Sequence, residues 1–190
     1  MPLAKARWRS RWVIGWAGGQ GVRSFEGFPF GSGRGRLKAA QKVGAAISIN
    51  PEKENFLEEV RVSINGEGGD VAFECVGGRH SGFFENSFTR AVNSARKRGI
   101  TIILGVFDEP IYFRFVKLLI FERQTTAAWL FEPKDFVEGI HLIASGKMVL
   151  DPLITDKISL DEIIPKGFLE LELNRDQHIK ILVNPQGRGN

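Results

Sequence analysis

The chain has 190 residues, of which 43% are hydrophobic, a single cysteine and a formal net charge of +4. This length suits one domain with a buried core, and the lone Cys75 excludes an internal disulfide and metal sites built from paired cysteines. No apolar run reaches the roughly 18 residues of a membrane span, and no signal peptide is evident, so we expect a cytoplasmic location and no membrane partner.

Residues 1–36 differ in composition from the rest of the chain. They hold seven basic residues and one acidic residue, three of the four tryptophans and eight of the 22 glycines. The stretch 7–15 can form a short strand that ends at Gly15, whereas the Gly-rich and Phe-rich stretch 25–35 is typical of a loop. We therefore predict that residues 1–35 form an irregular basic segment, and we expect no nucleic-acid partner.

From Arg36 onwards the pattern predicts alternating helices and strands, followed by a disordered tail at 186–190. The predicted helices cover 37–43, 56–64, 81–97, 136–143 and 160–171; the predicted strands cover 45–49, 70–77, 100–106, 124–130 and 179–183; residues 113–121 are helical or extended, and 150–155 are extended. We assign residues 36–185 to one domain.

The stretch Asp70–Gly77 organises this domain. It is an apolar run bounded by glycines, which indicates a strand buried on both faces. The run Ile100–Val106 follows after a segment long enough for a crossover helix, so the two predict a βαβ unit. Ligands bind beyond the carboxyl ends of such strands, where Gly77 and Gly105 allow a close approach to the backbone.

Residues 36–185 resemble the carboxyl-terminal part of the zinc-dependent, medium-chain alcohol dehydrogenases, and most of all the polyol, butanediol and threonine dehydrogenases. The resemblance rests on the order and spacing of several short stretches, which are Lys42–Ala45, Ile49–Pro51, Asp70–Gly77, Ile103–Val106, Pro133–Phe136, Ile143–Lys147, Asp151–Thr155 and Ile179–Val183. It implies an α/β fold, an incomplete Rossmann-type doubly wound parallel sheet, in which the first βαβ unit is degraded.

The resemblance also implies a cofactor, NAD(P), and a set of residues that would bind it. Cys75, Val76 and Gly77 match the strand end under the nicotinamide ribose, and Leu104, Gly105 and Val106 match the backbone that bonds the carboxamide. Ala128 and Trp129 match the strand beside the nicotinamide, which pairs across a subunit dimer, and Lys180 matches a basic residue near the pyrophosphate. The alternatives are that the glycines only end strands, that Trp129 is a core or dimer residue and that Lys180 is a solvated charge.

Two parts of the family pattern cannot be recognised in this chain. Gly19 and Gly21 miss the G-x-G-x-x-G spacing because position 24 is Ser24, and no acidic residue stands where the ribose would be held. The catalytic half that holds zinc in the family has no match, and the three histidines have no metal-ligand spacing, so we identify no catalytic or metal-binding residue. A frameshift or splicing error before Arg36 is one hypothesis for the unmatched start.

The sequence therefore predicts the NAD(P)-binding part of an oxidoreductase that moves a hydride between a secondary alcohol and NAD(P). We expect the chain alone to be catalytically incompetent. The alternatives are a non-catalytic dimerisation module, joined through the strand 124–130 as a homodimer, and a truncated gene product. The sequence does not name the alcohol or choose between NAD and NADP.

Overall fold

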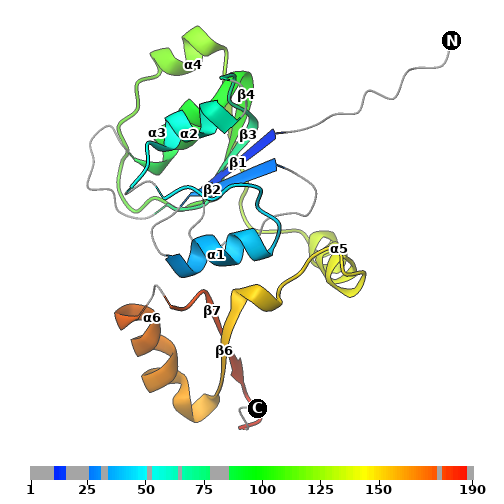
Figure 1. Cartoon of the computed structure of the whole chain (residues 1–190). Helices are drawn as coiled ribbons and strands as arrows, with labels where there is room; N and C mark the ends of the chain where they lie inside the picture. The colour runs from blue at the N-terminus through cyan, green and yellow to red at the C-terminus, as the bar shows by residue number, and fades with distance from the viewer. Residues whose placement is uncertain are drawn as a thin grey trace, which may run out of the picture.

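The computed structural model describes residues 11–15, 26–30, 34–50, 53–63, 66–77, 86–174 and 177–187, with backbone alone for the first two ranges and Arg34. Within these residues the chain folds into a five-stranded sheet, a separate two-stranded sheet and six α-helices (Figure 1).

The larger sheet is parallel throughout and has the strand order β2-β1-β3-β4-β5. Its strands are β1 (Arg11–Gly15), β2 (Glu26–Phe30), β3 (Gly69–Glu74), β4 (Ala95–Ile103) and β5 (Gln124–Ala127). The order reverses at β1, which has β2 on one side and β3 on the other. This arrangement confirms the predicted Rossmann-type sheet, and it places the ligand crevice of such sheets at the carboxyl ends of β1 and β3.

Helices cover this sheet to different extents. The helices are α1 (Arg34–Lys42), α2 (Phe56–Ser63), α3 (Ser87–Ser94), α4 (Val116–Phe121), α5 (Pro133–Ala144) and α6 (Leu169–Leu173). The main core joins α2 and α3 to β3 and consists of Ile49, Phe56, Val60, Ala72, Ala91 and Ala95. Because α3 contacts both β3 and β4, it forms the crossover of the predicted βαβ unit.

The smaller sheet pairs β6 (Ile154–Ser159) with β7 (Lys180–Asn184) in parallel. It is preceded by a 3₁₀ turn at Asp151–Leu153, and its strands are linked by a 3₁₀ turn at Leu160–Glu162, a π-helix at Ile163–Phe168 and α6. A second cluster, which contains Ala39 of α1, Val43 in the turn after α1 and Leu153, packs beside this sheet. Helix α1 therefore lies between the two sheets (Figure 1).

The structure corrects several predicted elements. The loop predicted for 25–35 is wrong, because Glu26–Phe30 forms β2 and α1 begins at Arg34. Strand β2 is the last strand of the described sheet on its side, and a proline such as Pro29 is tolerated on an edge strand. The predicted strand 45–49 is reduced to an isolated bridge at Ile49, whose buried side chain explains the apolar pattern.

The remaining corrections concern element boundaries. The helix predicted for 160–171 is broken, and the π-helical segment contains Pro165, which lacks the N–H that a regular helix needs. The crossover helix covers Ser87–Ser94 in the described part of the chain, and it ends earlier than predicted because the chain enters β4 at Ala95. The predicted tail at 186–190 lies mostly outside the described residues.

Candidate functional site

The carboxyl end of β3 is shaped by Glu74, a buried acidic residue. Its side chain has no exposed surface. One carboxylate oxygen, Oε1, accepts hydrogen bonds from the N–H groups of Val76 and Gly77, at 3.0 and 3.1 Å. The main-chain oxygen of Glu74 accepts two further bonds, from the N–H groups of Leu104 at 2.7 Å and Gly105 at 2.9 Å. A single residue thus holds both loops that follow β3 and β4.

These two loops are in direct backbone contact. Gly77 has a φ of +57°, and a Cβ atom there would lie 2.2 Å from the carbonyl oxygen of Val106. A Cβ at Gly105 would lie 2.3 Å from Oε2 of Glu74 and 2.4 Å from the nitrogen of Gly77. The close approach that the sequence predicted for a ligand is therefore made by one loop to the other. The absence of side chains at both glycines lets the loops close together.

The surface of this edge is apolar. Val76, Leu104 and Val106 project apolar side chains that are at least one-third exposed, and Val106 is the most exposed of them at 58%. Cys75 is partly buried, and burial, followed by the nearby charge of Glu74, raises the pKa of its thiol to about 11. The thiol is therefore protonated and neutral at pH 7, which makes it a weak nucleophile. This edge is suited to covering a flat, weakly polar group.

Eight of the nine predicted cofactor residues lie along this edge. Six belong to the two loops just described. Ala128 extends the edge, because its N–H donates to the carbonyl oxygen of Ile103 at 3.0 Å, and Trp129 follows it with 75% of its surface exposed. Lys180 is the exception. It is an exposed residue of β7, in the other sheet. That these nine residues bind a cofactor remains a prediction.

The segment that would hold the phosphate turn, after Gly15, lies outside the described residues. Glu74 was not predicted as a site residue, because an acidic residue inside a buried strand carries no spacing motif. Its signal was its position: a carboxylate in the middle of an apolar run must find buried hydrogen-bond donors.

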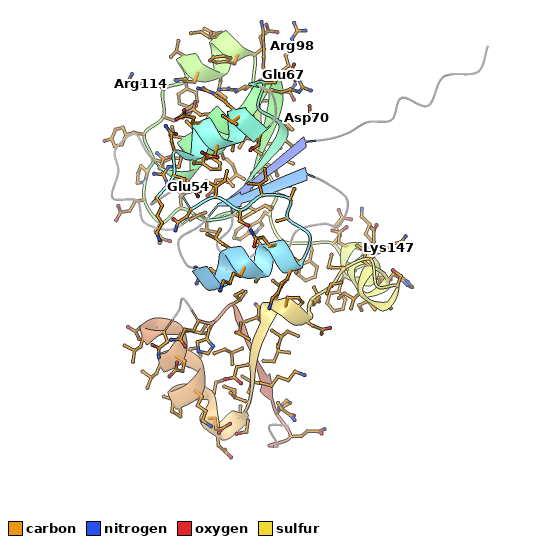
Figure 2. The ribbon with its side chains drawn as sticks, viewed as in Figure 1. Glu54, Glu67, Asp70, Arg98, Arg114 and Lys147 are labelled. Carbon is orange, nitrogen blue, oxygen red and sulfur yellow. The ribbon has the colours of Figure 1, made fainter. Side chains whose placement is uncertain are left out.

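The opposite, amino-terminal end of the sheet is strongly charged. Figure 2 shows Glu67, Asp70 and Arg98 at this end. Asp70 pairs with Arg96 at 2.5 Å, and Glu122 pairs with Arg98 at 2.7 Å and with Lys97 at 3.0 Å. Because most of these carboxylates and cations are partly exposed and already paired, they contribute little stability, and they act mainly as a polar cover for the strand ends.

A cavity of about 430 Å³ lies at this charged end. Three basic residues line it, which are Arg61, Lys97 and Arg123. The pKa of the Arg123 guanidinium is lowered, first by burial and then by repulsion from Arg61. Arg123 packs over the ring of Phe121 at 4.3 Å and donates to two carbonyl oxygens near the end of α3, at 3.4 and 3.5 Å. The positive charge of Arg123 therefore stabilises the carboxyl end of α3, where the helix dipole favours a cation.

Metal-ligating residues do not gather in the part of the chain that the structure describes. No group of three or more His, Cys, Asp or Glu side chains there is placed to hold a metal ion. The described helices also include none that is long and apolar enough to cross a membrane.

Comparisons with known proteins agree with this geometry. The profile of the zinc-binding dehydrogenases matches residues 30–145. The (R,R)-butanediol dehydrogenase of Neisseria gonorrhoeae is 29% identical over 148 residues, which cover 78% of this chain and 40% of that protein. The chain thus spans less than half the length of the curated relatives that it matches.

Solved structures share the fold. The 2R,3R-butanediol dehydrogenase from Bacillus subtilis superposes with a TM-score of 0.76 at 23% identity, over 93% of this chain and 51% of that one. A zinc-binding dehydrogenase from Sinorhizobium meliloti 1021, solved bound to NADP, has a TM-score of 0.70 at 19% identity, over 93% of this chain and 52% of that one. Since the matched profile covers well over half of the residues, the chain belongs to the zinc-binding dehydrogenase family.

Proposed function

We propose that this chain is the NAD(P)-binding part of an alcohol or polyol dehydrogenase. The observation that carries the proposal is the contact between the loops Cys75–Gly77 and Leu104–Val106 at the carboxyl edge of a parallel sheet. That edge adjoins the point where the strand order reverses, which is where doubly wound sheets bind dinucleotides. The family relationship supports the same cofactor.

The residues of the edge fit a nicotinamide ring. Val76, Leu104 and Val106 supply apolar side chains at the surface, and the loops that carry them are fixed by hydrogen bonds to Glu74. When bound, NAD(P) supplies the carbon that accepts or gives the hydride. The contribution of this chain is to fix the plane of the ring and to exclude water from one of its faces.

The substrate class comes from relatives. The butanediol dehydrogenases named above act on an alcohol that carries a neighbouring hydroxyl group, and we propose a secondary alcohol or polyol here. The family name implies zinc, but the described residues do not fit a zinc site, so we assign no step to a metal. We propose that the chain alone binds cofactor without oxidising an alcohol. Turnover of 2,3-butanediol with NAD or NADP, in the presence of zinc, would overturn this point.

A titration with NADH and NADPH tests cofactor binding. Energy transfer from tryptophan to the bound nicotinamide should saturate below millimolar cofactor, and ADP-ribose should reverse it. Val106→Asp places a negative charge on the exposed edge and should weaken binding about tenfold. Val62→Asp is the matched control, because Val62 is an exposed valine on α2. No saturation up to millimolar cofactor, or equal losses in both variants, would contradict the proposal.

A second candidate function is a dimerisation module. Strand β5 is the last strand of the described sheet, and all four of its residues are exposed. The segment that follows exposes Trp129, Leu130 and Phe131. A strand edge with exposed apolar side chains favours pairing with a second copy of the chain. Sedimentation should show a dimer that Trp129→Lys weakens, and a monodisperse monomer at about 100 μM would contradict this candidate.

A further inference from the structure

Glu74 makes more hydrogen bonds across the proposed cofactor edge than its place in a buried strand requires. Backbone groups of a parallel strand are normally satisfied by its neighbours, with no need of a carboxylate. Here the side chain turns back to bond the N–H groups of Val76 and Gly77, at 3.0 and 3.1 Å. Its main-chain oxygen bonds the N–H groups of Leu104 and Gly105. Four donors from two loops therefore converge on one residue.

The second carboxylate oxygen adds a further constraint. Oε2 of Glu74 is buried, and it has no hydrogen-bond partner among the residues that the structure describes. It lies at the position where a side chain on Gly105 would begin, since a Cβ there would be only 2.3 Å away. A buried, unpartnered carboxylate oxygen is costly, so its retention suggests a role that an apolar residue would not fill.

We propose that Glu74 is a positioning residue for the nicotinamide half of the cofactor; this inference rests on the proposed function. Through Oε1 it fixes the backbone that carries Val76, and through its main-chain oxygen it fixes the backbone that carries Leu104. It thereby sets the separation of the two apolar side chains that would cover the ring. In a sheet with this strand order the adenosine and the phosphates would bind toward β1 and β2, so Glu74 would contact neither of them.

The substitutions Glu74→Gln and Glu74→Ala distinguish this positioning role from a general contribution to folding. Glutamine can keep an acceptor for Val76 and Gly77, but it replaces Oε2 with an NH₂ group at a buried position where the described residues offer no hydrogen-bond partner. Alanine removes both carboxylate oxygens and keeps the main-chain oxygen. Glu58→Gln is the matched control, because Glu58 is an exposed acid on α2.

Binding is measured with two probes, NADH and ADP-ribose, which lacks the nicotinamide ring. We expect both Glu74 variants to bind NADH at least about tenfold more weakly than wild type, with ADP-ribose affinity unchanged within about twofold. The control should bind both probes as wild type does. Equal losses for the two probes, or no loss for either, would overturn the positioning role while leaving the proposed function intact. A wild-type chain that binds neither probe would refute the proposed function, and this inference with it.

A measurement on the wild-type chain covers the case in which the variants fail to fold. If Glu74 fixes the two loops, the amide hydrogens of Val76, Gly77, Leu104 and Gly105 should exchange with solvent as slowly as those in α3. Fast exchange at these four amides, followed by NMR, would overturn the inference without any substitution.

Discussion

Helices α3 and α5 are both amphipathic, but the structure treats them differently. Five of the eight residues of α3 are buried, whereas none of the twelve residues of α5 is. Within the described part of the chain, α3 contacts β1, β3 and β4, and α5 has no comparable contact with a strand. An apolar stripe therefore predicts that a helix has a buried face only where a partner element is present. The stability of the sheet rests on the α2 and α3 side.

The largest expected effect comes from comparing two phenylalanines, one on the core helix α2 and one on the exposed helix α5. Phe56 of α2 is 4% exposed and belongs to the main core, whereas Phe136 of α5 is 61% exposed. Phe56→Ala should lower the free energy of unfolding by about 3–5 kcal/mol, because it removes a buried ring and leaves a cavity. Phe136→Ala should cost less than about 1 kcal/mol, mostly from its stacking on Phe131. Urea unfolding measures both, and similar losses would contradict the comparison.

The second effect compares two glycines. Gly77→Ala should destabilise the chain by about 2–3 kcal/mol, because its Cβ would collide with the backbone of Val106 and its φ is positive. Gly139→Ala in α5 meets nothing within 4 Å, so it should stabilise the chain by about 0.5–1 kcal/mol through helix propensity. Thermal unfolding gives the sign of each change. A neutral Gly77→Ala would show that the two loops do not pack as described.

A smaller effect concerns the start of α3. The Oδ1 atom of Asn86 accepts from the N–H of Thr89 at 2.8 Å, and its Nδ2 donates to the carbonyl oxygen of Tyr112 at 3.0 Å. Asn86→Ala removes both bonds and should cost about 1–2 kcal/mol. Asn86→Ser keeps a side-chain oxygen that can cap the helix and loses the link to Tyr112, so it should cost less. Equal losses in the two variants would assign the whole effect to the link instead of the cap.

The smallest effect is a pH dependence in the second sheet region. The Lys166 ammonium first, and then the N–H and O–H of Ser159, lower the pKa of Glu162 from 4.5 to about 2. Because the pKa of Glu162 is lower in the folded state, its carboxylate stabilises the fold at pH values above the unfolded-state pKa of 4.5. This stabilisation is lost on acidification between pH 4.5 and about 2. Glu162→Gln should flatten stability against pH in that window, whereas Glu172→Gln on α6 should not. Parallel acid-unfolding curves for wild type and Glu162→Gln would contradict this.

The sequence predicted the elements whose signals are local. The apolar run after Asp70, the turn at Gly44 and the proline at the start of α5 each marked a boundary that the structure places within a few residues. The sequence-based prediction failed where pairing between strands decides the secondary structure. Glu26–Phe30 reads as a loop, because glycine and proline disfavour strands, yet it pairs with β1 along its whole length.

The candidate site was only partly predicted, because some of its contacts join residues that are far apart in the sequence. Gly77 and Gly105 signal close backbone approach, and the parallel sheet brings them together, but sequence does not say that the approach is to each other. Glu74 was missed because its role depends on donors more than 25 residues away in Leu104 and Gly105. Lys180 was placed by resemblance alone, and the strand that carries it lies in a different sheet.

Hydrogen exchange of the whole chain, measured by mass spectrometry with and without NADH, tests the central claim most directly. If the carboxyl edge binds the nicotinamide, NADH should slow exchange in peptides that span Cys75–Gly77 and Leu104–Val106, and it should leave the cavity around Arg61 and Arg123 unchanged. Protection confined to that cavity, or no protection anywhere at saturating NADH, would contradict the account.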